Sequence, residues 1–74
     1  MEINLEFEKE KEESIINVAY ELIELVEKDS AKNGVTQDHI LAIICFERSI
    51  LYKGKGSLLM EAWLNKGLRL AISV

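Results

Sequence analysis

The chain has 74 residues, with thirteen acidic and nine basic side chains and a formal net charge of −4. This length accommodates a single domain, residues 1–74, whose core alone supplies only about 3 to 5 kcal/mol of stability. One cysteine excludes an internal disulfide, and one cysteine with one histidine is too few for the usual structural zinc sites. We therefore expect no cofactor, and we expect oligomerisation or a protein partner to supply the missing stability.

Acidic residues are concentrated in the first half of the chain. Residues 1–36 carry ten acidic and four basic side chains, whereas residues 37–74 carry three acidic and five basic ones. The first half therefore repels nucleic acid. Its glutamates are typical of a solvated helix face, and the alternative is a face that meets a basic surface on a partner.

The first predicted elements are a short strand and a long helix. Ile3, Leu5 and Phe7 alternate with polar residues, which is the period of a strand. From about residue 11 to 32 the apolar residues recur at helical spacing and cover roughly 220° of the helix, well beyond the stripe of about 100° that one neighbour requires. We expect this helix to contact partners on two sides and to end at Gly34.

A second helix is predicted from a cap at Thr36 to about Lys53. Residues 40–46 within it are apolar without a break, which indicates a central helix wrapped on all sides by its own neighbours or by a second copy. The same run is compatible with a buried strand. Because the apolar pattern continues through Tyr52, past the length of a strand, we favour the helix.

A third helix is predicted after the glycine-containing loop 53–57, with Ser57 as its cap. Gly67 interrupts its pattern, and the apolar residues of 68–74 then alternate as in a strand, although a helix continued through Gly67 also keeps an apolar face. The fold class is therefore mainly α: a small three-helix domain, with a short two-stranded β element formed by the N- and C-terminal segments as an option. We expect a homodimer.

The loop before the third helix is a candidate anion site. Gly54-Lys55-Gly56-Ser57 resembles the tail of a phosphate-binding loop only superficially, because the Gly-Lys-Ser/Thr order is absent. A weaker prediction is contact between Lys53, Lys55 and Ser57 and a single anion or a carboxylate of a partner. The alternative is a plain turn between helices.

Two residues with chemical potential are expected to have no catalytic role. His39 follows Asp38 directly, and neighbouring helix residues point about 100° apart, so the two do not form a pair; we expect a surface or boundary histidine. Cys45 lies within the apolar run, where a thiol acts as a small buried hydrophobe. We expect neither catalytic residues nor metal ligands, and hence no enzyme.

A docking surface is the sharpest prediction for the C-terminal part. Trp63 is either core or a binding anchor, because tryptophan dominates interaction hot spots when it fills a partner's pocket. The end of the chain is apolar, whereas an ordinary terminus is polar. The predicted partner-binding residues are Met60, Trp63, Leu70, Ile72 and Val74.

These observations favour a small acidic protein-interaction module. We expect a regulator or inhibitor that binds itself and another protein, broadly like the short modulators made by phages and mobile elements, a comparison that rests on no motif. One alternative is a DNA-binding regulator with a helix-turn-helix in residues 37–66, and another is a self-assembling structural component. Because the sequence shows neither a leader nor a membrane-spanning segment, we expect a cytoplasmic location. We expect binding neither to a membrane, nor to nucleic acid, nor to a small-molecule substrate.

Overall fold

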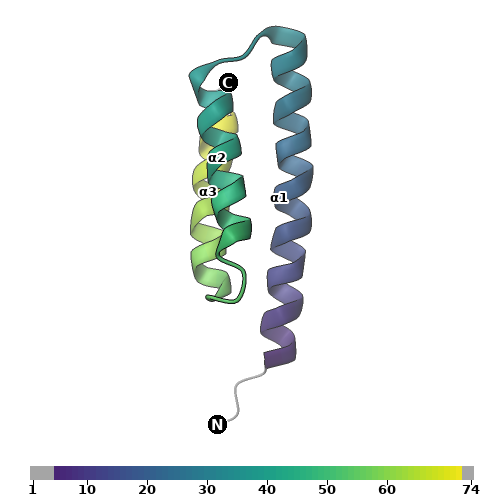
Figure 1. Ribbon diagram of the computed structural model, residues 1–74, viewed down its shortest axis with the longest axis vertical. Coiled ribbons are helices and arrows are strands. Elements are labelled where there is room, and N and C mark those ends of the chain that lie inside the picture. Colours follow the sequence, from purple (N-terminus) through teal and green to yellow (C-terminus); the bar gives the residue numbers. More distant parts are fainter. Residues whose placement is uncertain (1–4, 73–74) are drawn as a thin grey trace.

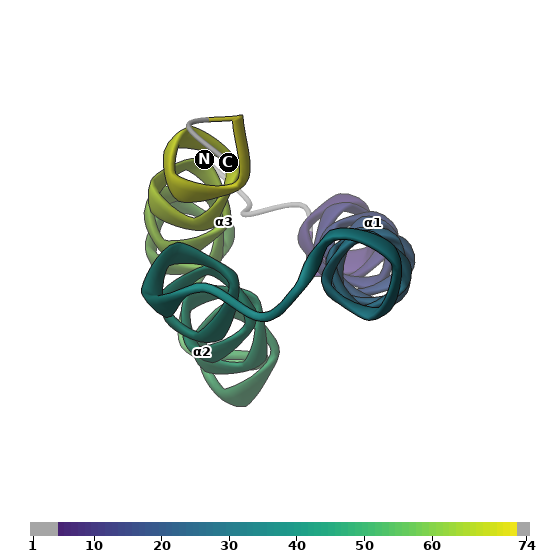
Figure 2. The same cartoon turned by 90° about the horizontal axis from the view of Figure 1, so that it is seen from above.

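The computed structural model describes residues 5–72, which form three helices (Figure 1). α1 spans Leu5–Asn33, α2 spans Gln37–Leu51 and α3 spans Ser57–Ile72. α2 and α3 form a helical hairpin that packs along α1, and from above the three helices stand at the corners of a triangle (Figure 2). The predicted mainly α, three-helix fold is confirmed.

α1 is longer than the sequence pattern predicted. It begins at Leu5, so the strand expected around Leu5 and Phe7 is wrong; Ile3 lies outside the described residues. Three alternating residues are too short a signal to outweigh helix formation across the next turns. The predicted end is confirmed at Gly34, which has φ +95° and donates its N–H to the Ser30 carbonyl at 2.9 Å.

Thr36 caps α2 as predicted, and His39 completes the cap. Thr36 Oγ1 accepts the His39 backbone N–H at 3.1 Å, and the Thr36 N–H donates to His39 Nδ1 at 2.9 Å. Because Nδ1 accepts a hydrogen bond, the ring proton lies on Nε2, which donates to Asp29 Oδ2 of α1 at 2.7 Å. His39 is therefore buried at the turn between α1 and α2, and its expected surface position is wrong.

α3 continues through Gly67 to Ile72, so of the two alternatives left open for residues 68–74 the continued helix is correct and the strand is wrong as far as Ile72. Gly67 marks a close approach and not a break. A Cβ atom at this position would lie 2.5 Å from a ring carbon of the buried Phe46 side chain. The glycine therefore lets α3 pack directly onto the aromatic ring of α2. Val74 lies outside the described residues.

The core lies between the three helices in two neighbouring clusters. Ser49, which is fully buried, donates its hydroxyl to the Met60 carbonyl at 2.7 Å and ties α2 to α3. Cys45 is buried, as predicted. The first cluster contains Ala19, Val26, Ala42 and Phe46, and the second contains Ile15, Ile16 and Met60.

Candidate protein-interaction face around α2

Four large apolar side chains of α2 remain exposed to solvent. They are Ile40, Leu41, Ile44 and Leu51, with exposed fractions between 39% and 76%, and together they are called the α2 ridge. Ile40, Ile44 and Leu51 follow one another at intervals of four and seven residues, which places them along one line of the helix surface. The ridge lies on the side of α2 that faces away from the core. It is an apolar surface that the described residues of this chain leave uncovered.

The chain itself covers only one side of the apolar run 40–46. Ala42, Cys45 and Phe46 are buried, whereas three residues of the α2 ridge from the same run are not. Of the two predicted ways to wrap this helix, cover by the chain's own neighbours alone is wrong for the described residues, and cover by a second copy stays a prediction. Sequence reasoning missed the ridge as a site because an unbroken apolar run does not reveal which of its sides the other helices cover.

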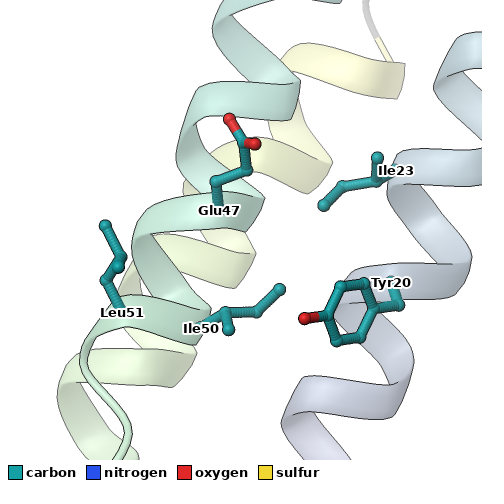
Figure 3. Close-up of a pocket in the computed structure, with 5 residues that line it drawn as sticks. All are labelled: Tyr20, Ile23, Glu47, Ile50 and Leu51. Carbon is teal, nitrogen blue, oxygen red and sulfur yellow. The ribbon is translucent and has the colours of Figure 1, made fainter.

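A first groove separates the α2 ridge from α1 (Figure 3). Ile23 of α1 and Ile50 of α2 point toward each other across it, and the Tyr20 ring closes one end. Glu47 and Leu51 form its outer border on α2. The groove is thus apolar, with a single carboxylate at its edge.

A second groove runs between α2 and α3 on the other side of the ridge. It is lined by Leu41 and Ile44 of the ridge and by Cys45, Arg48, Trp63, Lys66 and Leu70. The Arg48 guanidinium lies 5.0 Å and the Lys66 ammonium 5.3 Å from the centre of the Trp63 ring, both within cation–π range. Tyr52 stacks on the same ring at a centroid distance of 6.4 Å. The second groove is therefore apolar with a basic edge.

The residues predicted to bind a partner do not form one surface. Met60 is fully buried in the core, where no partner reaches it. Trp63 and Leu70 are half-buried and line the second groove. Ile72 is 81% exposed and lies on the other side of α3, near α1. The structure thus brings two of the predicted residues together with the α2 ridge.

The predicted carboxylate contact of the loop is made within the chain. Glu12 of α1 accepts the Gly54 N–H on Oε1 at 3.1 Å and the Gly56 N–H on Oε2 at 3.2 Å. Glu8, one turn earlier, accepts the Ser57 N–H at 2.7 Å. Both glycines have positive φ, which turns their N–H groups toward α1. These carboxylates satisfy backbone donors at the start of α3, where a negative charge is favourable.

The two lysines of the loop lie outside this contact. Lys53 pairs with Glu13 of α1 at 2.6 Å, and the hydrogen bond that its ammonium donates to this carboxylate raises the pKa of Lys53. Lys55 is exposed. Of the predicted anion-contact residues, only Ser57 donates to a carboxylate through its backbone, and Lys53 contributes an ion pair at the surface.

Acid should weaken the contact between Glu8 and α3. Hydrogen bonds from the backbone and side chain of Ser57 hold the pKa of Glu8 below its usual value of 4.5. Because the pKa is lower in the folded state, the contact stabilises the fold fully above the unfolded-state pKa and is lost as pH falls through the folded-state pKa.

We therefore expect the free energy of unfolding to fall as the pH drops below about 4.5, and to fall less steeply in Glu8→Gln than in the wild type. Urea denaturation at successive pH values measures this slope. Glu10→Gln, at an exposed position of the same helix, should keep the wild-type slope. Equal slopes for Glu8→Gln and the wild type would contradict the role of this carboxylate.

The geometry does not favour the helix-turn-helix alternative for residues 37–66. α2 and α3 run side by side in opposite directions (Figures 1 and 2), whereas the helices of that motif cross at about 90 to 120°. The exposed side of α3 carries apolar residues such as Leu58 and Leu59, which offer no hydrogen bonds to base edges.

Across residues 5–72, no group of three or more His, Cys, Asp or Glu side chains is placed to hold a metal ion. The helices of this range are also too short or too polar to cross a membrane. No protein-family model matches the chain, no curated protein matches its sequence, and no solved structure matches its fold. The α2 ridge and its two grooves are apolar surfaces that the described residues leave open.

Proposed function

We propose that this chain is a small acidic protein-interaction module, a homodimer that regulates or inhibits another protein by binding it. The observation that supports this function most is the α2 ridge, because four neighbouring apolar side chains exposed on one helix are typical of a protein-binding surface. The grooves on either side give a partner helix places for its own side chains. We place the protein in the cytoplasm, where an unpaired thiol such as Cys45 stays reduced.

The side chains that could support other chemistry already have structural roles. Both ring nitrogens of His39 are hydrogen-bonded, Nδ1 in the cap of α2 and Nε2 to Asp29 of α1, and the Cys45 thiol is buried. The carboxylates of Glu8 and Glu12 are held by the backbone of the loop. The exposed apolar surface of the α2 ridge supports binding to another protein, because such patches are typical of interaction sites.

The function is tested by affinity capture from the source cells with a matched pair of variants. Ile44→Lys places a charge at the centre of the α2 ridge, whereas Leu58→Lys places the same charge at an 80% exposed leucine of α3 that lines neither groove. Both sites are at the surface, so both variants should fold, which circular dichroism checks.

We expect mass spectrometry to find a protein that the wild type and Leu58→Lys retain and that Ile44→Lys loses, with and without nuclease. If the captured proteins are the same for both variants, the ridge is not the binding surface. If only further copies of this chain are captured, the self-assembling alternative replaces the regulator. If the captured proteins are lost after nuclease treatment, the DNA-binding alternative replaces the regulator.

A further inference from the structure

The α2 ridge is bordered by opposite charges on its two sides. Glu47 lines the first groove, toward α1, and Arg48 lines the second groove, toward α3. Consecutive helix residues point about 100° apart, so the two side chains project on either side of Ile44. Within residues 5–72 Glu47 takes part in no ion pair, although it lies at the edge of an apolar groove (Figure 3). This carboxylate therefore lacks a cationic partner.

The helices behind these two residues carry the same contrast in charge. α1, beyond the first groove, has nine acidic and four basic side chains, a net charge of −5. α3, beyond the second groove, has one acidic and two basic side chains, a net charge of +1, and its Lys66 stands beside Arg48 at the Trp63 ring. The face around the α2 ridge thus carries Glu47 on its acidic side, apolar side chains in the middle, and Arg48 with Lys66 on its basic side.

Symmetry decides how such a face meets a copy of itself. Two identical surfaces in contact are related by a two-fold axis that lies in the plane of the contact. An axis perpendicular to α2 would set the acidic side of one copy against the acidic side of the other, which is unfavourable. An axis parallel to α2 sets the acidic side of each copy against the basic side of its partner. Only the second arrangement matches opposite charges.

We propose that a second copy of this chain packs on the α2 ridge, with the two-fold axis parallel to α2 and Glu47 of each copy opposite Arg48 of its partner. Ile44 and Leu51 then lie at the axis and meet their own equivalents. Ile40 meets Leu41 of the partner in the same way that Glu47 meets Arg48. The contact between Glu47 and Arg48 occurs twice, so a single charge substitution changes two contacts per dimer. The inference rests on the proposed role of the ridge as a protein-binding surface and names its occupant in the free protein; a regulated protein that binds the ridge takes the place of the second copy.

Analytical ultracentrifugation of charge-exchanged variants tests the pairing. We expect a dimer for the wild type, and dissociation constants raised by about tenfold for Glu47→Arg and for Arg48→Glu, because each places two like-charged contacts in the dimer. The double variant Glu47→Arg/Arg48→Glu should regain most of the wild-type affinity, since the opposite charges face each other again. A wild type that is monomeric at all accessible concentrations, or a double variant no better than the single ones, would overturn the proposal.

Cross-linking tests the direction of the axis. In a Cys45→Ala background, Ile44→Cys and Leu51→Cys should each form a disulfide with the same residue of the partner, because a parallel axis brings equivalent residues together at both heights. An axis perpendicular to α2 at Ile44 would separate the two Leu51 positions by about 21 Å, far beyond the reach of a disulfide. Disulfides at only one position, or at neither, would exclude the parallel arrangement.

The two proposals fail in different experiments. If the wild type sediments as a monomer while Ile44→Lys still loses a captured protein, the ridge binds another protein and the second copy is excluded. If the dimer forms as described while the captured proteins ignore Ile44→Lys, self-association stands and the ridge is not the site of regulation.

Discussion

Replacing Phe46 with alanine should lower the free energy of unfolding by about 3 to 5 kcal/mol, the cost of emptying a buried aromatic site. The Phe46 ring is fully buried, packs with Ala19, Val26 and Ala42, and touches the position where Gly67 lacks a side chain. Because α3 approaches α2 so closely at Gly67, the backbone has little freedom to close the cavity. The loss is comparable to the whole stability of a domain of this length.

Urea denaturation followed by circular dichroism measures the loss in the free energy of unfolding. If Phe46→Ala is already unfolded in water, Phe46→Leu is measured in its place. Leu58→Ala is the matched control, because Leu58 is 80% exposed and should change the stability by less than about 0.5 kcal/mol. Ile44→Ala tests the exposed side of the apolar run. It should weaken the association of the proposed dimer more than it lowers the free energy of unfolding of one chain. A melting curve of Phe46→Ala equal to that of the wild type would contradict the role of this ring in the core.

The sequence was sufficient for the features that depend on local pattern. The three helices follow from apolar residues at helical spacing, the end of α1 follows from Gly34, and the cap of α2 follows from Thr36. Cys45 could be placed in the core because it lies within an apolar run. Each of these predictions needs only the residues within one or two turns of the position concerned.

The features that sequence reasoning missed depend on residues far apart in the chain. Gly67 suggested an interruption, yet it fits a helix because Phe46, twenty-one residues earlier, occupies the space of its side chain. His39 can be buried because Asp29 of α1 accepts the hydrogen of its second ring nitrogen, Nε2. The hydrogen bonds between His39 and Thr36 could have been predicted from the sequence. His39 follows Thr36 by three residues, which is the spacing of a capping box, with histidine in place of glutamate.

The candidate site was predicted only in part for the same reason. Trp63 and Leu70 were expected at a binding surface and line the second groove, but Met60 from the same helix is fully buried. Periodicity gives the faces of a helix without saying which face meets the other helices. The α2 ridge could be located only after α1 and α3 had been placed around α2.

Replacing Glu12 with alanine should have the second largest effect, a loss of about 2 to 3 kcal/mol in the free energy of unfolding. The Glu12 residue is only 6% exposed, and its two carboxylate oxygens accept the N–H groups of Gly54 and Gly56. Without them, two partly buried backbone donors of the loop lose their partners. A hydrogen bond to a charged group contributes more than a neutral one, and leaving its donor unpaired adds the cost of desolvation.

The neighbouring Glu13 gives a matched control, since both glutamates lie on α1 and contact the same loop. Glu13 pairs with Lys53 at the surface, where both side chains are more than half exposed, so Glu13→Ala should cost less than about 1 kcal/mol. Glu12→Gln should fall between the two, because its amide oxygen still accepts one N–H while its NH2 group faces the other. Equal unfolding free energies for Glu12→Ala and Glu13→Ala would show that the buried carboxylate contributes no more than a surface ion pair, and the joining of α1 to the start of α3 would then rest on apolar packing alone.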